Sequence, residues 1–202
     1  MMTSQLAAFA ILALLSLVGG QPPPPPKRCC LPDQWSSVMS DLSTINSATL
    51  GLMSLQYDYK QQKQSMVSVT NDPVTKAVNV TARTVIDFAR KEMYYLPMND
   101  PSKCMKSPYP IGAVQCVPDN ATYLGSTYLG PMGGPLTYDG WRFQLPGGPL
   151  FVTLGVTRDG CVPLVEGVTT PGKPQNDKLF LFTAYQPKIA NPDDFNLPAS
   201  CL

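Results

Sequence analysis

The chain contains six cysteines, and all of them lie downstream of an apolar N-terminal stretch typical of a secretory signal. An even number of cysteines in an exported chain predicts disulfides, because the secretory route is oxidising. Such cross-links fix which distant segments lie together, so they restrict the fold more than any other feature of the sequence. The six are Cys29, Cys30, Cys104, Cys116, Cys161 and Cys201.

The N-terminal stretch predicts a signal peptide at residues 1–20. Residues 6–18 are apolar apart from Ser16, and this run is too short to cross a bilayer as a helix. The residues before it include no lysine or arginine, which leaves a buried helix or a membrane anchor as the alternative. No later segment is long and apolar enough to form a transmembrane segment. We therefore expect a secreted, extracellular protein with a mature chain of about 182 residues.

Residues 21–28 open the mature chain with five consecutive prolines, which favour an extended polyproline II leader. A partner that recognises proline is the alternative role for this leader. It ends in Lys27-Arg28, which is either a solvated basic pair or a dibasic processing site. Residues 29–202 are long enough to form one domain with a real core.

Charge and composition exclude several functional classes. Fifteen lysines and arginines balance fourteen acids, so the chain has no basic stripe for nucleic acid. The absence of histidine excludes Ser-His-Asp hydrolysis, Cys-His catalysis and histidine-ligated metals. Paired carboxylates could still support glycosidase chemistry, but the only glutamates are Glu92 and Glu166. We predict that the protein is not an enzyme and has no cofactor, with calcium left open as a bound ion.

Twenty-two prolines and fifteen glycines indicate many short strands joined by turns. Several runs alternate apolar with polar residues, as Met53, Leu55 and Tyr57 do, which is typical of a half-buried antiparallel strand. About nine strands predict a mainly β fold, a two-sheet sandwich or a partly open barrel. The predicted strands are residues 52–59, 65–70, 78–88, 92–96, 122–129, 136–143, 150–156, 162–169 and 179–185.

We expect one or two short helices beside the strands. Asn191 is a capping residue followed by a proline and two aspartates, the pattern of a helix start, and Pro198 would end that helix after about two turns. Residues 35–50 are polar with scattered apolar residues and could contain a helical turn.

Two sequons predict N-glycosylation, at Asn79 and Asn120. Neither sequon has a proline in its middle position, and a secreted chain passes through the glycosylation machinery. Carbohydrate at these two positions would mark them as surface and keep them out of any interface.

Calcium binds carboxylate and carbonyl oxygens, and the chain has no EF-hand loop of the required spacing. The pairs Asp193/Asp194 and Asp139/Asp159 could contribute to a loop site. Helix-capping and turn roles explain the same residues, so the sequence assigns no metal ligand.

Six motifs follow one another along nearly the whole mature chain and together resemble the ependymin-related proteins. No single motif is specific to the family, but the order and spacing of the motifs in a secreted chain are specific when taken together. The order of proline and aspartate is altered in the last motif. The motifs are Cys29-Cys30-Leu31-Pro32-Asp33-Gln34-Trp35, the strand pair at residues 57–59 and 66–69, residues 94–104, Val117-Pro118-Asp119-Asn120-Ala121-Thr122, Asp159-Gly160-Cys161-Val162-Pro163, and residues 191–201.

The resemblance implies two stacked antiparallel sheets around a deep apolar pocket, similar to bacterial lipoprotein carriers. Members of the family are secreted, disulfide-linked glycoproteins, often homodimers, that bind calcium and lipids and are linked to extracellular matrix and cell adhesion. Nine methionines, nine tyrosines and seven phenylalanines, which otherwise would simply fill a core, then become candidates to line the pocket. The residues expected there are Met53, Leu55, Tyr57, Met66, Met93, Tyr95, Phe143, Phe151, Phe180 and Phe182.

The family pattern also implies disulfides. Six cysteines allow 15 connectivities, and a strained bridge between adjacent Cys29 and Cys30 is excluded. By position in the family pattern, Cys29 pairs with Cys161 and Cys104 pairs with Cys201. Cys30 and Cys116 depart from the better-known vertebrate pattern, so their pairing is inferred by remainder, with an intermolecular bond as the alternative.

The leading hypothesis is therefore a secreted glycoprotein that binds a hydrophobic small molecule or lipid between two sheets. The alternative is an extracellular matrix or adhesion component with calcium-dependent contacts and an incidental pocket. A homodimer and matrix components are the protein partners that the resemblance implies.

Overall fold

The structure is a computed structural model that describes residues 24–44, 51–71, 78–100, 102–131 and 136–201. The predicted signal peptide and the first three residues of the leader lie outside these ranges. Within them the chain forms eleven strands and four short 3-10 helices. The strands are β1 (Gln34–Asp41), β2 (Gly51–Asp58), β3 (Lys63–Asn71), β4 (Val78–Asp87), β5 (Glu92–Pro97), β6 (Met105–Pro108), β7 (Thr122–Leu129), β8 (Leu136–Gln144), β9 (Phe151–Thr157), β10 (Pro163–Thr169) and β11 (Lys178–Gln186). The helices are η1 (Leu42–Thr44), η2 (Pro174–Asn176), η3 (Pro192–Phe195) and η4 (Ala199–Cys201).

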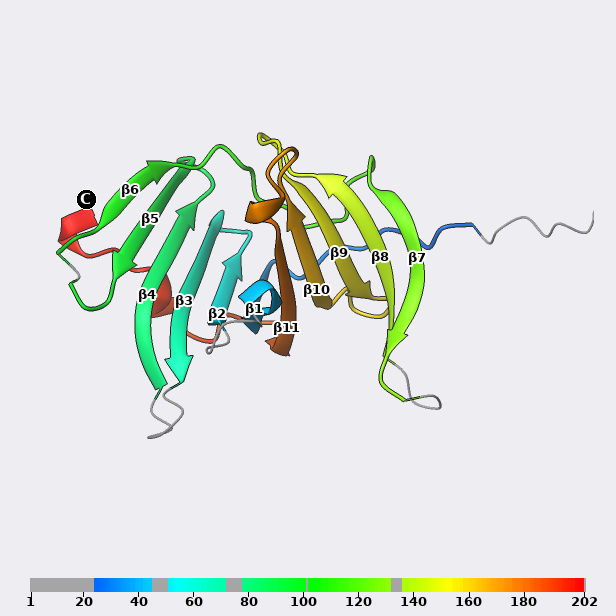
Figure 1. Cartoon of the computed structure of the whole chain (residues 1–202), viewed down its shortest axis with the longest axis horizontal. Helices are drawn as coiled ribbons and strands as arrows, with labels where there is room; N and C mark the ends of the chain where they lie inside the picture. The colour runs from blue at the N-terminus through cyan, green and yellow to red at the C-terminus, as the bar shows by residue number, and fades with distance from the viewer. Residues whose placement is uncertain (1–23, 45–50, 72–77, 101, 132–135, 202) are drawn as a thin grey trace, which may run out of the picture.

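All eleven strands belong to one antiparallel sheet, in the order β6-β5-β4-β3-β2-β1-β11-β10-β9-β8-β7. The sheet does not close, and β6 and β7 form its two edges. Figure 1 shows that it bends into two halves, β1–β6 and β7–β11, which meet where β1 pairs with β11. The prediction of a mainly β, partly open sandwich is confirmed, and its two sheets are the two halves of this single sheet.

The nine predicted strands are confirmed as β2–β5 and β7–β11, whereas β1 and β6 were missed. The helical turn expected within residues 35–50 is η1, but β1 precedes it. β1 lies between two other strands at the centre of the sheet, and small polar residues are buried on both of its faces. Ser36, Ser37 and Ser40 are buried there, so the apolar–polar alternation that reveals a half-exposed strand is absent.

The helix predicted after Asn191 is present but short. The side chain of Asn191 accepts a hydrogen bond from the backbone of Asp193 at 3.3 Å, as the capping pattern predicts. The helix, η3, is a single 3-10 turn and ends at Phe195, instead of continuing for two turns.

A bulge in β11 lies where the two halves of the sheet meet. Between the pairs Ser36–Gln186 and Val38–Thr183, two residues of β11 oppose one residue of β1. The first of them is Ala184, whose φ of 50° lies in the left-handed region. A bulge increases the local twist and bends the strand that carries it. The bend of the sheet is therefore associated with an irregularity at its central pairing.

The main hydrophobic core lies on one face of the bent sheet, which we call the inner face. It is the face that carries Leu55 and Tyr57 of β2 and Trp141 and Phe143 of β8. Buried side chains from both halves form one contiguous cluster, which joins the halves. Its buried members are Leu31, Trp35, Met39, Leu55, Tyr57, Ile86, Phe88, Val117, Ala121, Trp141, Phe143, Val152, Leu154, Val156, Cys161 and Phe182.

The opposite, outer face of β2–β4 is crossed by the C-terminal segment, residues 187–201. Gln56 accepts a hydrogen bond from the backbone of this segment at 2.9 Å, and the Ser65 hydroxyl donates one at 2.9 Å. The Arg83 guanidinium donates to two of its carbonyls, at 2.7 and 3.2 Å. The buried side chains of Gln56 and Ser65 on the outer face thus find hydrogen-bond partners in the backbone of the chain end.

A second, smaller core lies under the end of this segment. Cys201 packs there with the buried Val85, Tyr94 and Leu96. The disulfide Cys104–Cys201 connects the segment to the stretch before β6. The C-terminal segment is therefore held by hydrogen bonds, by apolar packing and by a covalent bond.

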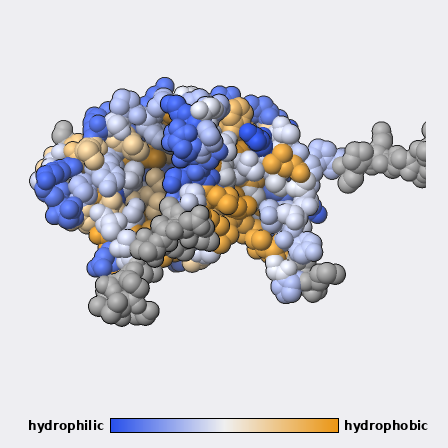
Figure 2. Space-filling view, in the orientation of Figure 1, coloured by the Kyte–Doolittle hydropathy of each residue, from blue (hydrophilic) through white to orange (hydrophobic). Residues whose placement is uncertain are grey.

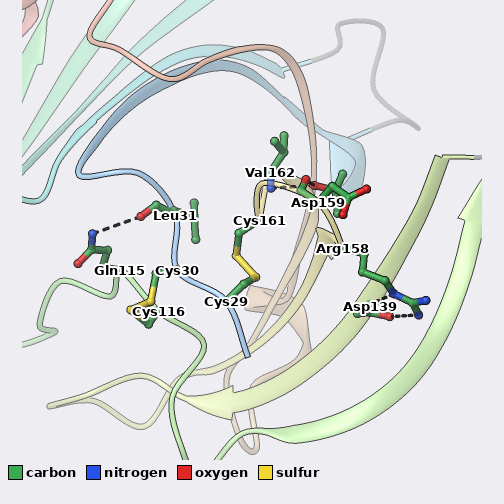
Figure 3. Close-up of a disulfide and its surroundings, with 11 residues drawn as sticks. Cys29, Cys30, Leu31, Gln115, Cys116, Asp139, Arg158, Asp159, Cys161 and Val162 are labelled. Carbon is green, nitrogen blue, oxygen red and sulfur yellow. Dashed lines mark hydrogen bonds and ion pairs between the residues drawn. A yellow bond between two sulfur atoms is a disulfide. The ribbon is translucent and has the colours of Figure 1, made fainter. Parts of the chain in front are cut away.

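The other two disulfides fix the N-terminal segment at two different places (Figure 3). Cys29 bonds to Cys161 in the β9–β10 turn, and Cys30 bonds to Cys116 in the connection between β6 and β7. Backbone hydrogen bonds on either side of Cys30 pair the two segments as a short antiparallel bridge. The three disulfides join the same cysteines as the pairing that the resemblance implies.

We predict that removing the Cys104–Cys201 bond loosens the C-terminal segment in particular. The double substitution Cys104→Ala/Cys201→Ala should lower the free energy of unfolding by about 2–4 kcal/mol, because the bond closes a loop of 97 residues. Hydrogen exchange at residues 187–201 should accelerate. The matched variant Cys30→Ala/Cys116→Ala should leave exchange in this segment unchanged, and equal acceleration in both variants would contradict the assignment.

Candidate functional site

The inner face continues from the core to the open edge of the sheet at β6. Cross-strand pairs place Leu55, Met66, Thr84, Tyr95 and Met105 in one line, which we call the inner row. Leu55 is buried, whereas Tyr95 and Met105 leave 37% and 57% of their surface exposed. The core thus extends into an apolar surface that remains open to solvent, and such surfaces commonly mark binding sites.

The structure brings most of the ten predicted pocket residues together on this face. Leu55, Tyr57, Phe143 and Phe182 are buried in the main core, and Met53, Met66, Met93 and Phe180 are half-buried against it. Tyr95 lies on the inner row. Phe151 is the one predicted pocket residue that lies on the outer face. It pairs there with Gln144, and its ring lies 5.4 Å from the Arg142 guanidinium.

Apolar side chains also reach the surface in the middle of the molecule. Figure 2 shows apolar surface in the middle of the molecule, in the region of β9 and β10. Phe180 of β11 and Val168 of β10 are half-buried and pack against the main core. Methionines and aromatic rings that are only half-covered can rearrange around a ligand at little cost.

A group of stacked aromatic rings forms one end of the inner face. Trp35 lies 5.6 Å from Tyr57 and 5.9 Å from Tyr185, measured between ring centroids. The Tyr57 hydroxyl both donates to and accepts from the backbone of Val114, at 3.0 and 2.9 Å. By contrast, the indole nitrogen of Trp35 and the hydroxyl of Tyr185 are buried without a hydrogen-bond partner among the described residues.

Glu166 places a single carboxyl group on the same face. It lies on β10 between Phe180 of β11 and Leu154 of β9, each directly opposite it in the pairing. The described residues offer its carboxyl no hydrogen bond and no ion pair. The surrounding apolar groups remove water from it, and this desolvation raises its pKa to about 7.

The sequence contains a signal for Glu166 in the residues that follow it on β10. Val168 lies two residues after it on the strand and packs against the main core, so the period of two places both on one face. A charged residue at an apolar position of such a strand is unusual and indicates a site. The role that composition suggests for Glu166 is instead half of a carboxylate pair with Glu92.

That pair does not form. Glu92 lies on the outer face of β5, where it bonds to Lys106 at 2.7 Å, whereas Glu166 lies on the inner face of β10. Glycosidase chemistry needs two carboxyl groups flanking one bond. The two glutamates of this chain lie on opposite faces and in different halves of the sheet.

Three of the four aspartates considered for calcium, Asp139, Asp193 and Asp194, are hydrogen-bonded to protein groups. Arg158 donates to both carboxylate oxygens of Asp139, at 3.0 and 3.2 Å (Figure 3). Asp193 and Asp194 each accept a hydrogen bond from a neighbouring asparagine side chain, at 3.0 and 2.8 Å. Within the described ranges, no three or more acidic, cysteine or histidine residues gather in a way that could hold a metal ion.

Two depressions lie away from the inner row, near β7 and β8. One, of about 460 Å³, is bounded by the end of the leader and by Tyr123 and Trp141. Arg28 lies over the Trp141 ring at 6.0 Å and donates to the backbone of Asp119. The other, of about 800 Å³, is formed mainly by the β8–β9 turn and Pro118. None of the ten predicted pocket residues lines either of these two depressions.

Both predicted glycosylation sites lie on the surface. Asn79 is exposed on β4, and Asn120 is exposed in the turn before β7. Neither residue lies on the inner row. Glycosylation at these positions stays a prediction.

Comparison with known proteins gives a family and a fold. The family model of ependymin matches residues 76–201, more than half of the chain. A crystal structure of an uncharacterized conserved protein from Thermus thermophilus is similar, with a TM-score of 0.50 and 13% sequence identity over 84% of this chain and 88% of that one. At this identity the likeness concerns the fold alone. The comparison with curated proteins found no match. Among the described residues, no helix has the length and apolarity to cross a bilayer.

The two tyrosines at the aromatic end predict opposite effects of the same substitution. Tyr185→Phe should raise the free energy of unfolding by about 1 kcal/mol, because it removes a buried hydroxyl that has no partner. Tyr57→Phe should lower it by about 1–2 kcal/mol, because both backbone groups of Val114 lose their partner. Urea denaturation of the two variants measures the difference, and destabilisation by Tyr185→Phe would show that its hydroxyl is satisfied.

Glu166 should make the folded state less stable as the pH rises. Its folded pKa of about 7 exceeds the ordinary value of 4.5, so the folded state binds the proton more tightly between these values. Its contribution to stability is complete below pH 4.5 and is lost as the pH rises through 7. Between pH 5 and 8 we expect a loss of about 2–3 kcal/mol, measured by urea denaturation.

Glu166→Gln should remove this slope. Glu92→Gln is the matched control and should retain it, since its ion pair with Lys106 lowers the pKa of Glu92 and it stays ionised across this range. An unchanged slope in Glu166→Gln would show that another group is responsible.

Proposed function

Because the chain belongs to the ependymin family, we propose that it is a secreted, disulfide-linked glycoprotein that binds hydrophobic small molecules, lipids foremost, against the inner face of its bent sheet. The family and the three disulfides fit an extracellular protein. The observation that carries the proposal is the inner row, which leads from the buried core to exposed apolar side chains at β6.

Burial of an acyl chain supplies the driving force. Each CH₂ group transferred from water to an apolar surface contributes about 0.8 kcal/mol. The inner row offers Met66, Tyr95 and Met105 as its partly uncovered members, and the long methionine side chains can adapt to chains of different shape. Recognition of this kind selects for apolar length more than for a particular chemical structure.

A second candidate function, contact with another protein, has its own supporting observation. The edge at β7 and the neighbouring part of β8 expose four large apolar side chains, which each leave between 42% and 53% of their surface uncovered. An unpaired edge strand with apolar side chains suits a second copy of the chain or a matrix component. The four are Leu124, Tyr128, Leu129 and Leu136.

Native mass spectrometry of the protein purified from its own secretion tests the lipid proposal. We expect co-purifying lipid at near one molecule per chain. An empty chain that associates with itself only in the presence of calcium would overturn the proposal and favour the matrix function.

A substitution on the inner row localises the binding. Met105→Glu should reduce the bound lipid several-fold, because it places a charge where the acyl chain would lie. Met98→Glu is the matched control, since Met98 is also exposed, at 41%, but lies in the turn after β5, outside the inner row. Equal loss of lipid in both variants, or no loss in either, would place the ligand elsewhere.

A further inference from the structure

We infer that the inner face prefers amphiphiles whose polar head is a cationic amine, and that Glu166 is the residue that recognises this head. The inference rests on the proposed function, because it assumes that an apolar tail occupies the inner face. It adds a chemical class of ligand, which the apolar residues alone cannot specify.

The position of Glu166 is the first argument. Cross-strand pairing places Phe180, Glu166, Leu154 and Trp141 in one line across β11, β10, β9 and β8. The carboxyl group is thus flanked by an aromatic ring on one side and by an aliphatic side chain on the other. The Glu166 side chain is only partly buried, so a ligand can reach it.

The absence of a protein cation is the second argument. The titratable groups that face Glu166 from the other half are Tyr57 of β2 and Tyr109 of the connection after β6. Burial raises the pKa of both phenols, so both are neutral at physiological pH. The nearest lysine along β11 is Lys178, and its ammonium is bonded to Asp41 at 3.0 Å. No described residue therefore neutralises the carboxylate.

The chemistry of the ligand follows from this arrangement. An ionised carboxylate in apolar surroundings is unfavourable unless a cation or a strong donor accompanies it. A ligand carboxylate would add a second negative charge, and a neutral alcohol would supply only one ordinary hydrogen bond. An alkylammonium supplies both charge and donors, and the neighbouring ring of Phe180 can contribute a cation–π interaction.

The inference also predicts how binding depends on pH. Glu166, with a pKa of about 7 in the free protein, is half-protonated near neutrality, whereas an alkylammonium stays charged because its pKa lies near that of lysine, about 10.4. Amine binding requires the ionised carboxylate. Affinity should therefore rise between pH 5 and 8, and binding at pH 7 should release a fraction of a proton.

Three probes with one tail length test the inference: dodecylammonium, dodecanol and dodecanoate. Isothermal titration calorimetry of the full, disulfide-bonded protein at pH 8 should show dodecylammonium binding roughly tenfold more tightly than dodecanol. Dodecanoate should bind more weakly than dodecanol. The preference for the amine should fall severalfold at pH 5. Glu166→Gln should abolish the preference for the amine over the alcohol. The control Glu92→Gln changes an ion-paired glutamate on the outer face and should retain this preference.

The outcomes separate the inference from the proposed function. Binding of dodecanol with no preference for the amine, or a preference that survives Glu166→Gln, would overturn the inference alone. Failure of all three probes to bind would overturn the proposed function and the inference together. If Glu166→Gln does not fold, the wild-type protein still tests the inference. The number of protons released on amine binding at pH 7 is obtained from binding enthalpies measured in buffers of different ionisation enthalpy. Amine binding without proton release would contradict the inference.

Discussion

The pairing of β1 with β11 holds the two halves of this molecule in one sheet. The two strands come from opposite ends of the folded chain, and the Ser37 hydroxyl donates to the carbonyl of Thr183 across a separation of 146 residues. Met39 and Phe182 face each other in the register and both enter the main core. Closing so long a loop costs conformational entropy. The Cys29–Cys161 disulfide, which spans 132 residues, reduces that cost by restricting the unfolded chain.

The sequence reveals those strands whose two faces differ in polarity. Strands such as β2 alternate apolar and polar residues, because one side packs in the core and the other is polar. β1 was missed because buried serines lie on both of its faces, and β6 because it has only four residues. The bend at the centre also could not be foreseen, since it coincides with an extra residue, Ala184, whose left-handed backbone leaves no mark in the composition.

The candidate site was predictable as a set of apolar residues and unpredictable as a surface. Eight of the ten expected residues belong to the main core or pack against it, because large apolar side chains on alternating strands share a face. Phe151 lies on the outer face, since position in the strand, and not hydrophobicity, decides the face. Which apolar residues stay uncovered depends on where the sheet ends. For Met105 that is the edge strand β6, which the sequence did not reveal.

An open inner face requires that stability come from elsewhere, and the outer face of β2–β5 provides it. There the C-terminal segment forms hydrogen bonds with Gln56, Ser65 and Arg83, and Cys201 joins a separate small core. The strands that carry the inner row are therefore held from behind by hydrogen bonds, packing and a disulfide. Since the order of these strands does not depend on closing the inner face, the apolar side chains of the inner row can remain uncovered. Uncovered groups of this kind are characteristic of a surface shaped for binding, where strict burial would leave no room for a ligand.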